Sequence, residues 1–185
     1  EKVLSYGNIG KEYVVLLKKI KNGAVAWDKA KSLTPDLDDT SIAFAISILL
    51  IKLNLAIREE VYMSPKIFLD HFRTKTGDFF CYLLERNTSP SHFLHFMLAL
   101  TYAIDNIEIF AEEDKKIIID LYHSLGKVIK KYSLQDLKSD KWQMSEYYNS
   151  SRYLFLREIN PSVAIETVNY ILDSQSKENG GWGIR

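Results

Sequence analysis

Apolar residues recur at helical spacing along most of this 185-residue chain, and only four prolines and eight glycines interrupt it. Because an α-helix returns to the same face every three to four residues, this periodicity predicts long helices. Strand-like segments do not alternate with helices, which argues against a nucleotide-binding α/β fold. We therefore predict an all-α protein, with helices at 13–20, at 38–57, from 64 to a break at 76–78, and at 91–104, 112–131, 145–156 and 161–174.

Loops that carry aromatic residues separate the predicted helices, with Trp27 in an early loop and Trp142 in a later one. Stacked helical hairpins bury a shared core in this way, either as solenoids or as closed rings. The length suits one domain, so we take 1–185 as a single domain of paired helices. Since the chain begins with Glu1 and not Met, we expect it to start inside a longer gene product or at a processed end.

Charge and cysteine content exclude several classes of function. Twenty-four basic residues balance twenty-four acidic ones, so no overall positive field would attract nucleic acid or an anionic membrane. Cys81 is the only cysteine, which rules out an intrachain disulfide and a cysteine-based zinc site. The longest apolar run, Ile42 to Ile51, is too short to span a bilayer. We predict a cytoplasmic protein with no transmembrane segment, no nucleic-acid partner and no metal ligands.

The segment Asp36-Leu37-Asp38-Asp39-Thr40 lies where a predicted loop becomes a helix, and two explanations fit it. The first is a helix cap, because Asp and Thr are preferred at N-caps and in first turns. The second is acid catalysis. Burial and a neighbouring carboxylate both raise the pKa of a carboxyl group, so such a cluster can keep one Asp protonated at neutral pH. In that case Asp38 is the proton donor, and Asp36 and Asp39 tune it.

Four segments of this chain match the motifs of one known family, in the same order. Residues 34–43 resemble the P-D-x-D-D-T-A segment of squalene–hopene cyclases and bacterial class II diterpene cyclases, in which the middle Asp is the general acid. Residues 89–100 resemble their S-x-N-A-H-x-L-x-A-L segment, and His95 matches the His. Residues 140–148 resemble their D-K-W-H-x-S-x-Y-Y segment, and residues 175–183 resemble the QW motif of this superfamily.

The resemblance to class II terpene cyclases implies a fold, a set of site residues and a reaction. The fold is an α/α barrel (toroid), here a terpene-cyclase β-type domain present whole or in part. The implied catalytic residues are Asp38 as general acid with Asp36 and Asp39. The implied pocket residues are Thr40, His95, Trp142 and Tyr148. The structural QW residues are Gln175, Gly180 and Trp182.

The implied reaction is protonation of an isoprenoid, which starts cyclisation without loss of diphosphate. The substrate expected first is geranylgeranyl diphosphate, and a squalene-type triterpene is the alternative. No cofactor is expected in this chain, although Mg²⁺ can accompany a diphosphate substrate. The expected partner is the remaining domain of the same cyclase.

Two positions depart from the family pattern, since Phe93 and Gln143 stand where the family has Asn and His. The acidic run Glu112-Glu113-Asp114 fits a helix N-terminus better than a Mg²⁺-linked diphosphate motif. A different class of function therefore stays in consideration, namely a non-catalytic α/α-toroid module that binds a protein partner. An Asp38 carboxyl that faced solvent with no apolar cavity beside it would favour that module.

Overall fold

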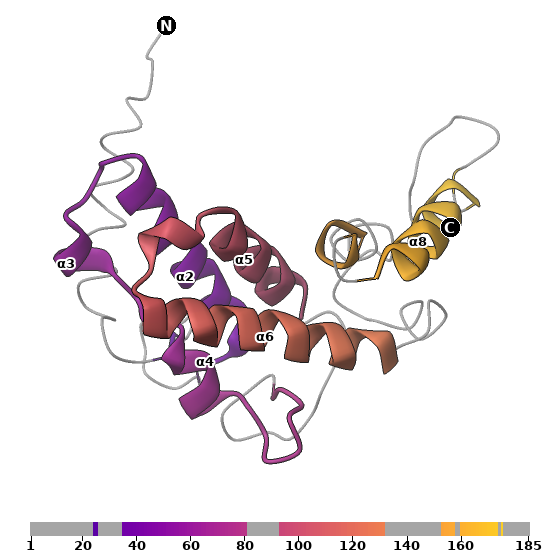
Figure 1. The fold of residues 1–185 in the computed structure, drawn as a ribbon, viewed down its shortest axis with the longest axis horizontal. Helices are drawn as coiled ribbons and strands as arrows, with labels where there is room; N and C mark the ends of the chain where they lie inside the picture. Colours follow the sequence, from indigo (N-terminus) through magenta and orange to yellow (C-terminus); the bar gives the residue numbers. More distant parts are fainter. Residues whose placement is uncertain are drawn as a thin grey trace, which may run out of the picture.

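The structure is a computed structural model that describes residues 24–25, 35–80, 93–131, 153–157, 160–173 and 175. The helices in this part are α2 (Leu37–Lys52), α3 (Arg58–Val61), α4 (Lys66–His71), α5 (Phe93–Asp105), the 3₁₀ helix η2 (Ile107–Ile109), α6 (Glu112–Lys131) and α8 (Pro161–Asp173) (Figure 1). The described ranges contain isolated bridge residues, such as the pair Arg73 and Phe79, but no strand. The predicted all-α fold class is therefore confirmed for them, whereas the helix expected at 13–20 and most of that at 145–156 lie outside the described residues.

Helix α2 is shorter than its sequence pattern predicted, because it ends at Lys52. Asn54 follows with a φ of 53°, in the left-handed region that Asn tolerates better than most residues. The Asn54 N–H donates to the carbonyl of Ile51 at 3.1 Å, and the Leu55 N–H donates to the carbonyl of Leu50 at 2.9 Å. These two bonds form the Schellman motif that closes many helices. The apolar spacing continued past this stop, which is why spacing alone made the helix too long.

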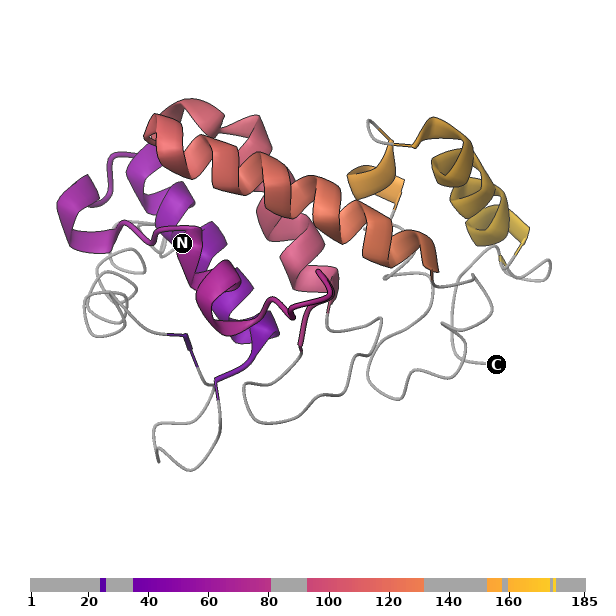
Figure 2. The same cartoon turned by 60° about the horizontal axis from the view of Figure 1, so that its bottom comes forward.

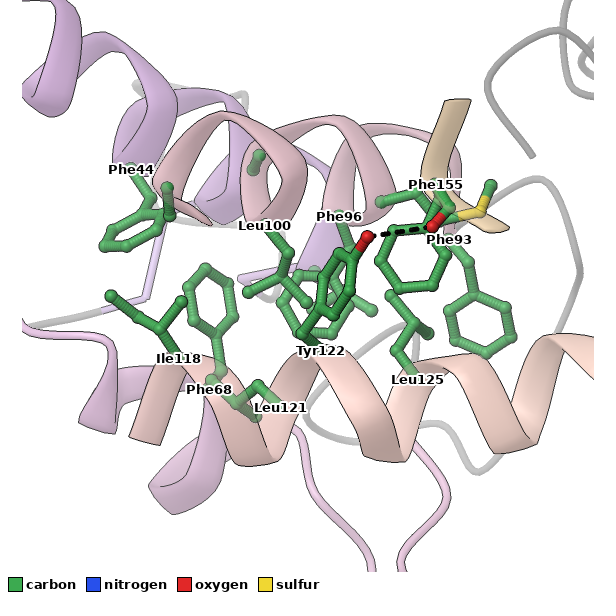
Figure 3. Packing of buried hydrophobic residues seen from close by; sticks show 14 of the residues in the cluster. Phe44, Phe68, Phe93, Phe96, Leu100, Ile118, Leu121, Tyr122, Leu125 and Phe155 are labelled. Carbon is green, nitrogen blue, oxygen red and sulfur yellow. Dashed lines mark hydrogen bonds between the residues drawn. The ribbon is translucent and has the colours of Figure 1, made fainter. Parts of the chain in front are cut away.

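Phenylalanine side chains dominate the core between these helices. Phe68 of α4 lies at its centre, with its ring centroid 4.7 Å from that of Phe96 and 5.3 Å from that of Phe44 (Figure 3). The Tyr122 hydroxyl of α6 donates to the backbone carbonyl of Phe155 at 2.9 Å, as the dashed line in Figure 3 shows. The phenylalanines with no exposed surface are Phe44, Phe68, Phe72, Phe79, Phe93, Phe96 and Phe155. Their full burial makes them packing residues of the interior.

Helices α2 and α5 run parallel, which follows from the contacts at their two ends. Asp38 meets His95 at the N-terminal ends, and the Lys52 ammonium lies 5.8 Å from the centroid of the Tyr102 ring at the C-terminal ends. The chain then reverses through η2, and α6 packs against α5 (Figure 2). The parallel pair therefore brings the first turns of α2 and α5 to the same end of the core.

None of the described helices combines the length and the apolar character that crossing a membrane would need.

Candidate active site

The acidic segment forms the N-terminal cap and the first turn of α2. Asp36 is the N-cap residue, with an extended backbone, and its Oδ1 accepts a hydrogen bond of 2.7 Å from the backbone N–H of Asp39. Asp38 and Asp39 follow in the first turn, where the helix dipole favours negative charge. Capping therefore accounts for the position of Asp36, but it does not account for the direction of the Asp38 side chain.

Asp38 reaches away from its own helix to His95 on α5. Its Oδ1 lies 2.5 Å from Nδ1 of His95, although the two residues are 57 positions apart in the sequence. The Asp38 and His95 side chains are 32% and 26% exposed, so the pair lies at the edge of the core and can be reached from solvent. Phe93 and Phe96, on either side of His95 in the sequence, are fully buried, so they anchor the first turn of α5 that carries the imidazole. Phe93, which stands where the class II cyclases have Asn, is thus a packing residue.

Electrostatic interactions make this cluster hold protons more tightly than separate side chains would. The hydrogen bond to Asp38 raises the pKa of His95 above its ordinary value of 6.5, burial opposes this rise, and the charges of the three aspartates add to it. Burial also raises the pKa of Asp36 above 3.8, the backbone N–H of Asp39 opposes it, and the charge of Asp38 adds to the rise. The arrangement can therefore accept and hold a proton close to Asp38.

Thr40 lies behind the carboxylates and has no exposed surface. Its hydroxyl donates to the backbone carbonyl of Asp36 at 2.6 Å and accepts a hydrogen bond of 2.9 Å from the backbone N–H of Val25. The contact with Val25 was not foreseen, because no local pattern links residues that are 15 positions apart. Thr40 therefore supports the acid turn from the inside.

Five of the ten predicted site residues meet at this end of the core. They are Asp36, Asp38, Asp39, Thr40 and His95. Gln175 lies just after α8, where its backbone N–H donates to the carbonyl of Leu172 at 3.2 Å. The remaining predicted site residues, Trp142, Tyr148, Gly180 and Trp182, lie outside the described residues.

A second polar cluster, which the sequence did not reveal, lies at the N-terminus of α6. Asp114 accepts hydrogen bonds from the Tyr62 hydroxyl and, at 2.9 Å, from the Ser64 hydroxyl. The Arg58 guanidinium lies 4.3 Å from the centroid of the Tyr62 ring and donates to the carbonyl of Ile109. Burial and the hydrogen bond to Asp114 raise the pKa of Tyr62. The acidic start of α6 was the available signal, but it did not identify partners about 50 positions away.

Neither of two surface hollows that are lined by described residues includes Asp38. The larger, about 630 Å³, borders the Tyr62 and Asp114 cluster, and the smaller, about 500 Å³, lies beside the turn between α2 and α3. No three His, Cys, Asp or Glu side chains within the described ranges come close enough to hold a metal ion.

Comparisons with protein-family models, with curated proteins and with solved structures found no match for this chain.

Proposed function

We propose that this chain is a class II terpene cyclase, or the acid-bearing domain of one, that protonates a prenyl substrate to start its cyclisation. The observation that carries the proposal is the 2.5 Å contact between Asp38 Oδ1 and His95 Nδ1. The two residues lie in separate sequence motifs, and the family resemblance assigned both motifs to one pocket. Neither helix propensity nor capping requires the two side chains to meet. Geranylgeranyl diphosphate is the proposed substrate, and a squalene-type triterpene is the alternative.

The proposed first step is proton transfer from Asp38 to an alkene carbon. An alkene is a very weak base, so the donor has to be a neutral carboxylic acid that releases its proton readily. A new C–H bond forms, which leaves a carbocation on the substrate and a carboxylate on Asp38. With its proton on Nδ1, His95 would donate to that carboxylate, and a hydrogen bond to the charged form stabilises it more than the neutral acid. The diphosphate is retained, since no C–O bond breaks in this step.

Asp36 and His95 would act on this step as positioning residues. Because burial raises the pKa of Asp36, this carboxyl group holds a proton over a wider pH range, and it then adds no negative charge beside Asp38. The carbocation would be stabilised by aromatic faces, at about 1–2 kcal/mol for each desolvated ring. Trp142 and Tyr148 are the rings we propose for this role from the family resemblance.

The helix arrangement supports the barrel part of the proposal. An α/α barrel places parallel inner helices side by side and returns the chain through outer helices. Helices α2 and α5 form such a parallel pair, and α6 packs against α5 after the chain has reversed. The remaining domain of the same cyclase is the proposed partner, the cytoplasm is the proposed location, and Mg²⁺ would arrive with the diphosphate substrate.

The test is incubation of the intact gene product with prenyl diphosphates of several lengths and with squalene, followed by mass-spectrometric product analysis. Removing a general acid typically costs about 10²- to 10⁴-fold in rate, so Asp38→Asn should abolish detectable cyclised product. Asp114→Asn is the matched control, because it makes the same change in the first turn of α6, and it should retain the product. A yield of cyclised product from Asp38→Asn equal to that of the wild type would contradict the assignment.

The second candidate, a non-catalytic α/α-toroid module that binds a protein partner, predicts a different result. It is favoured by the partial exposure of the Asp38 side chain. In that case no prenyl substrate yields a cyclised product with the wild-type gene product. The product assay would then show no difference between the wild type, Asp38→Asn and Asp114→Asn.

A further inference from the structure

We infer that the Thr40 hydroxyl is a clamp that holds the acid turn in place by tying it to an upstream segment, Ala24–Val25. Thr40 has no exposed surface. Its hydroxyl is engaged in both directions, as donor to the carbonyl of Asp36 and as acceptor from the N–H of Val25. The catalytic consequence of this clamp rests on the proposed function, whereas its structural consequence does not.

The clamp closes a small ring of hydrogen bonds around the N-cap of α2. The N–H of Val25 donates to the Thr40 hydroxyl at 2.9 Å, and the carbonyl of Val25 accepts from the N–H of Asp36 at 3.1 Å. Both backbone groups of Val25 are therefore satisfied by the acid turn. Helix capping alone needs none of these bonds, since Asp36 already caps α2 through its own carboxylate. The ring is thus a tertiary contact added to a helix start that is complete without it.

The ring fixes Asp36 through its backbone N–H and its carbonyl, in addition to its carboxylate. Asp38 leaves the same turn to reach His95, so any shift of the turn changes the separation of Asp38 Oδ1 and His95 Nδ1. Loss of the Thr40 hydroxyl would leave the N–H of Val25 without its acceptor, and partly buried polar groups that lose a partner drive local rearrangement. Thr40 is therefore a positioning residue for the proton donor.

The test compares Thr40→Val, which removes the hydroxyl at nearly constant shape, with Thr40→Ser, which keeps it. The imidazole of His95 is titrated by NMR in each protein, with His95→Gln used to assign its signal. We expect the pKa of His95 to fall toward its ordinary value in Thr40→Val and to stay at the wild-type value in Thr40→Ser. Thr167→Val is the control, because Thr167 is equally buried and its hydroxyl bonds only a carbonyl of its own helix, at 2.8 Å.

Three results would overturn the inference. The first is an unchanged His95 titration in Thr40→Val. The second is the same fall in Thr40→Ser, because this variant keeps the hydroxyl and the effect would then not follow its loss. The third needs no variant to fold, since amide hydrogen exchange on the wild type should show the Val25 N–H protected as strongly as amides within α2. An unprotected Val25 amide would mean that the clamp does not exist.

Turnover separates this inference from the proposed function. If the wild type makes cyclised product, Thr40→Val should lower kcat about 10- to 100-fold, as expected for a slightly misplaced donor, and leave KM nearly unchanged. If the wild type makes no product but His95 titrates as expected, the clamp stands and the cyclase assignment fails. If Thr40→Val loses the His95 shift and keeps full turnover, Thr40 does not position the donor, and this inference fails alone.

Discussion

Helices α2 and α6 both have acidic first turns, with Asp38 and Asp39 in α2 and Glu112, Glu113 and Asp114 in α6. The two N-termini are used differently. At α6, the two carboxylate oxygens of Asp114 accept from the hydroxyls of Tyr62 and Ser64. At α2, Oδ1 of Asp38 meets the imidazole of His95. The two aspartates occupy similar positions in their helices, but one is held by neutral hydroxyl donors and the other by a group that can itself take up a proton.

The difference teaches that the partner from another element, and not the acidic start itself, decides what each cluster can do. A hydroxyl partner such as Tyr62, whose pKa is raised by burial and by Asp114, stays neutral throughout the physiological range. An imidazole partner changes charge near neutral pH. The α6 cluster is therefore suited to joining segments, whereas the α2 cluster can also move protons.

The largest expected effect on stability is at α6. Asp114→Asn weakens two hydrogen bonds to a charged acceptor, which should lower the free energy of unfolding by about 2 kcal/mol. Asp38→Asn should cost no more than about 1 kcal/mol, because its ion pair with His95 is partly exposed. Urea denaturation of both variants measures this ranking. A larger loss for Asp38→Asn would show that the α2 cluster is mainly structural.

An intermediate effect is expected in the pH dependence of stability. His95 has a raised pKa in the folded chain. Its contribution to the free energy of unfolding is therefore fully present below the unfolded pKa of about 6.5, and it is lost as the pH rises through the folded pKa. The raised pKa of Tyr62 has the same sign, but its loss begins only above pH 10.

Urea midpoints measured between pH 6 and pH 9 test this separation. His95→Gln should flatten the curve in that range, and Tyr62→Phe should leave its slope unchanged. A slope that survives in His95→Gln would assign the neutral-range titration to another group.

The smallest effect is expected for an acid that stays within its own helix. Glu112 is 81% exposed and pairs with Lys115 three residues later at 2.6 Å. Such pairs on exposed helix surfaces contribute little, so Glu112→Gln should leave the urea midpoint unchanged within experimental error. A clear shift would mean that an acidic first turn stabilises α6 without a partner from another element.

Local sequence was sufficient for most of the described helices. The pattern predicted helices at 112–131 and 161–174, and the structure has α6 at Glu112–Lys131 and α8 at Pro161–Asp173. It failed at the end of α2, where Asn54 adopts a left-handed conformation inside a continuing apolar run. Periodicity reports which face is buried, but it does not report a single residue that leaves the helical backbone conformation.

The sequence by itself determined the helices, the cap at Asp36 and the residues proposed for acid chemistry, because helix propensity and capping act over a few neighbouring positions. Tertiary structure alone decided which of those residues meet. Asp38 reaches His95 across 57 positions, and Thr40 reaches Val25 across 15. The acidic start of α6 instead meets Tyr62 and Ser64, in the segment that follows α3. These contacts depend on how α2, α5 and α6 pack around a shared aromatic core. The sequence pattern shows which residues are buried, but the hydrophobic effect has no direction, so the pattern does not specify how the helices pack.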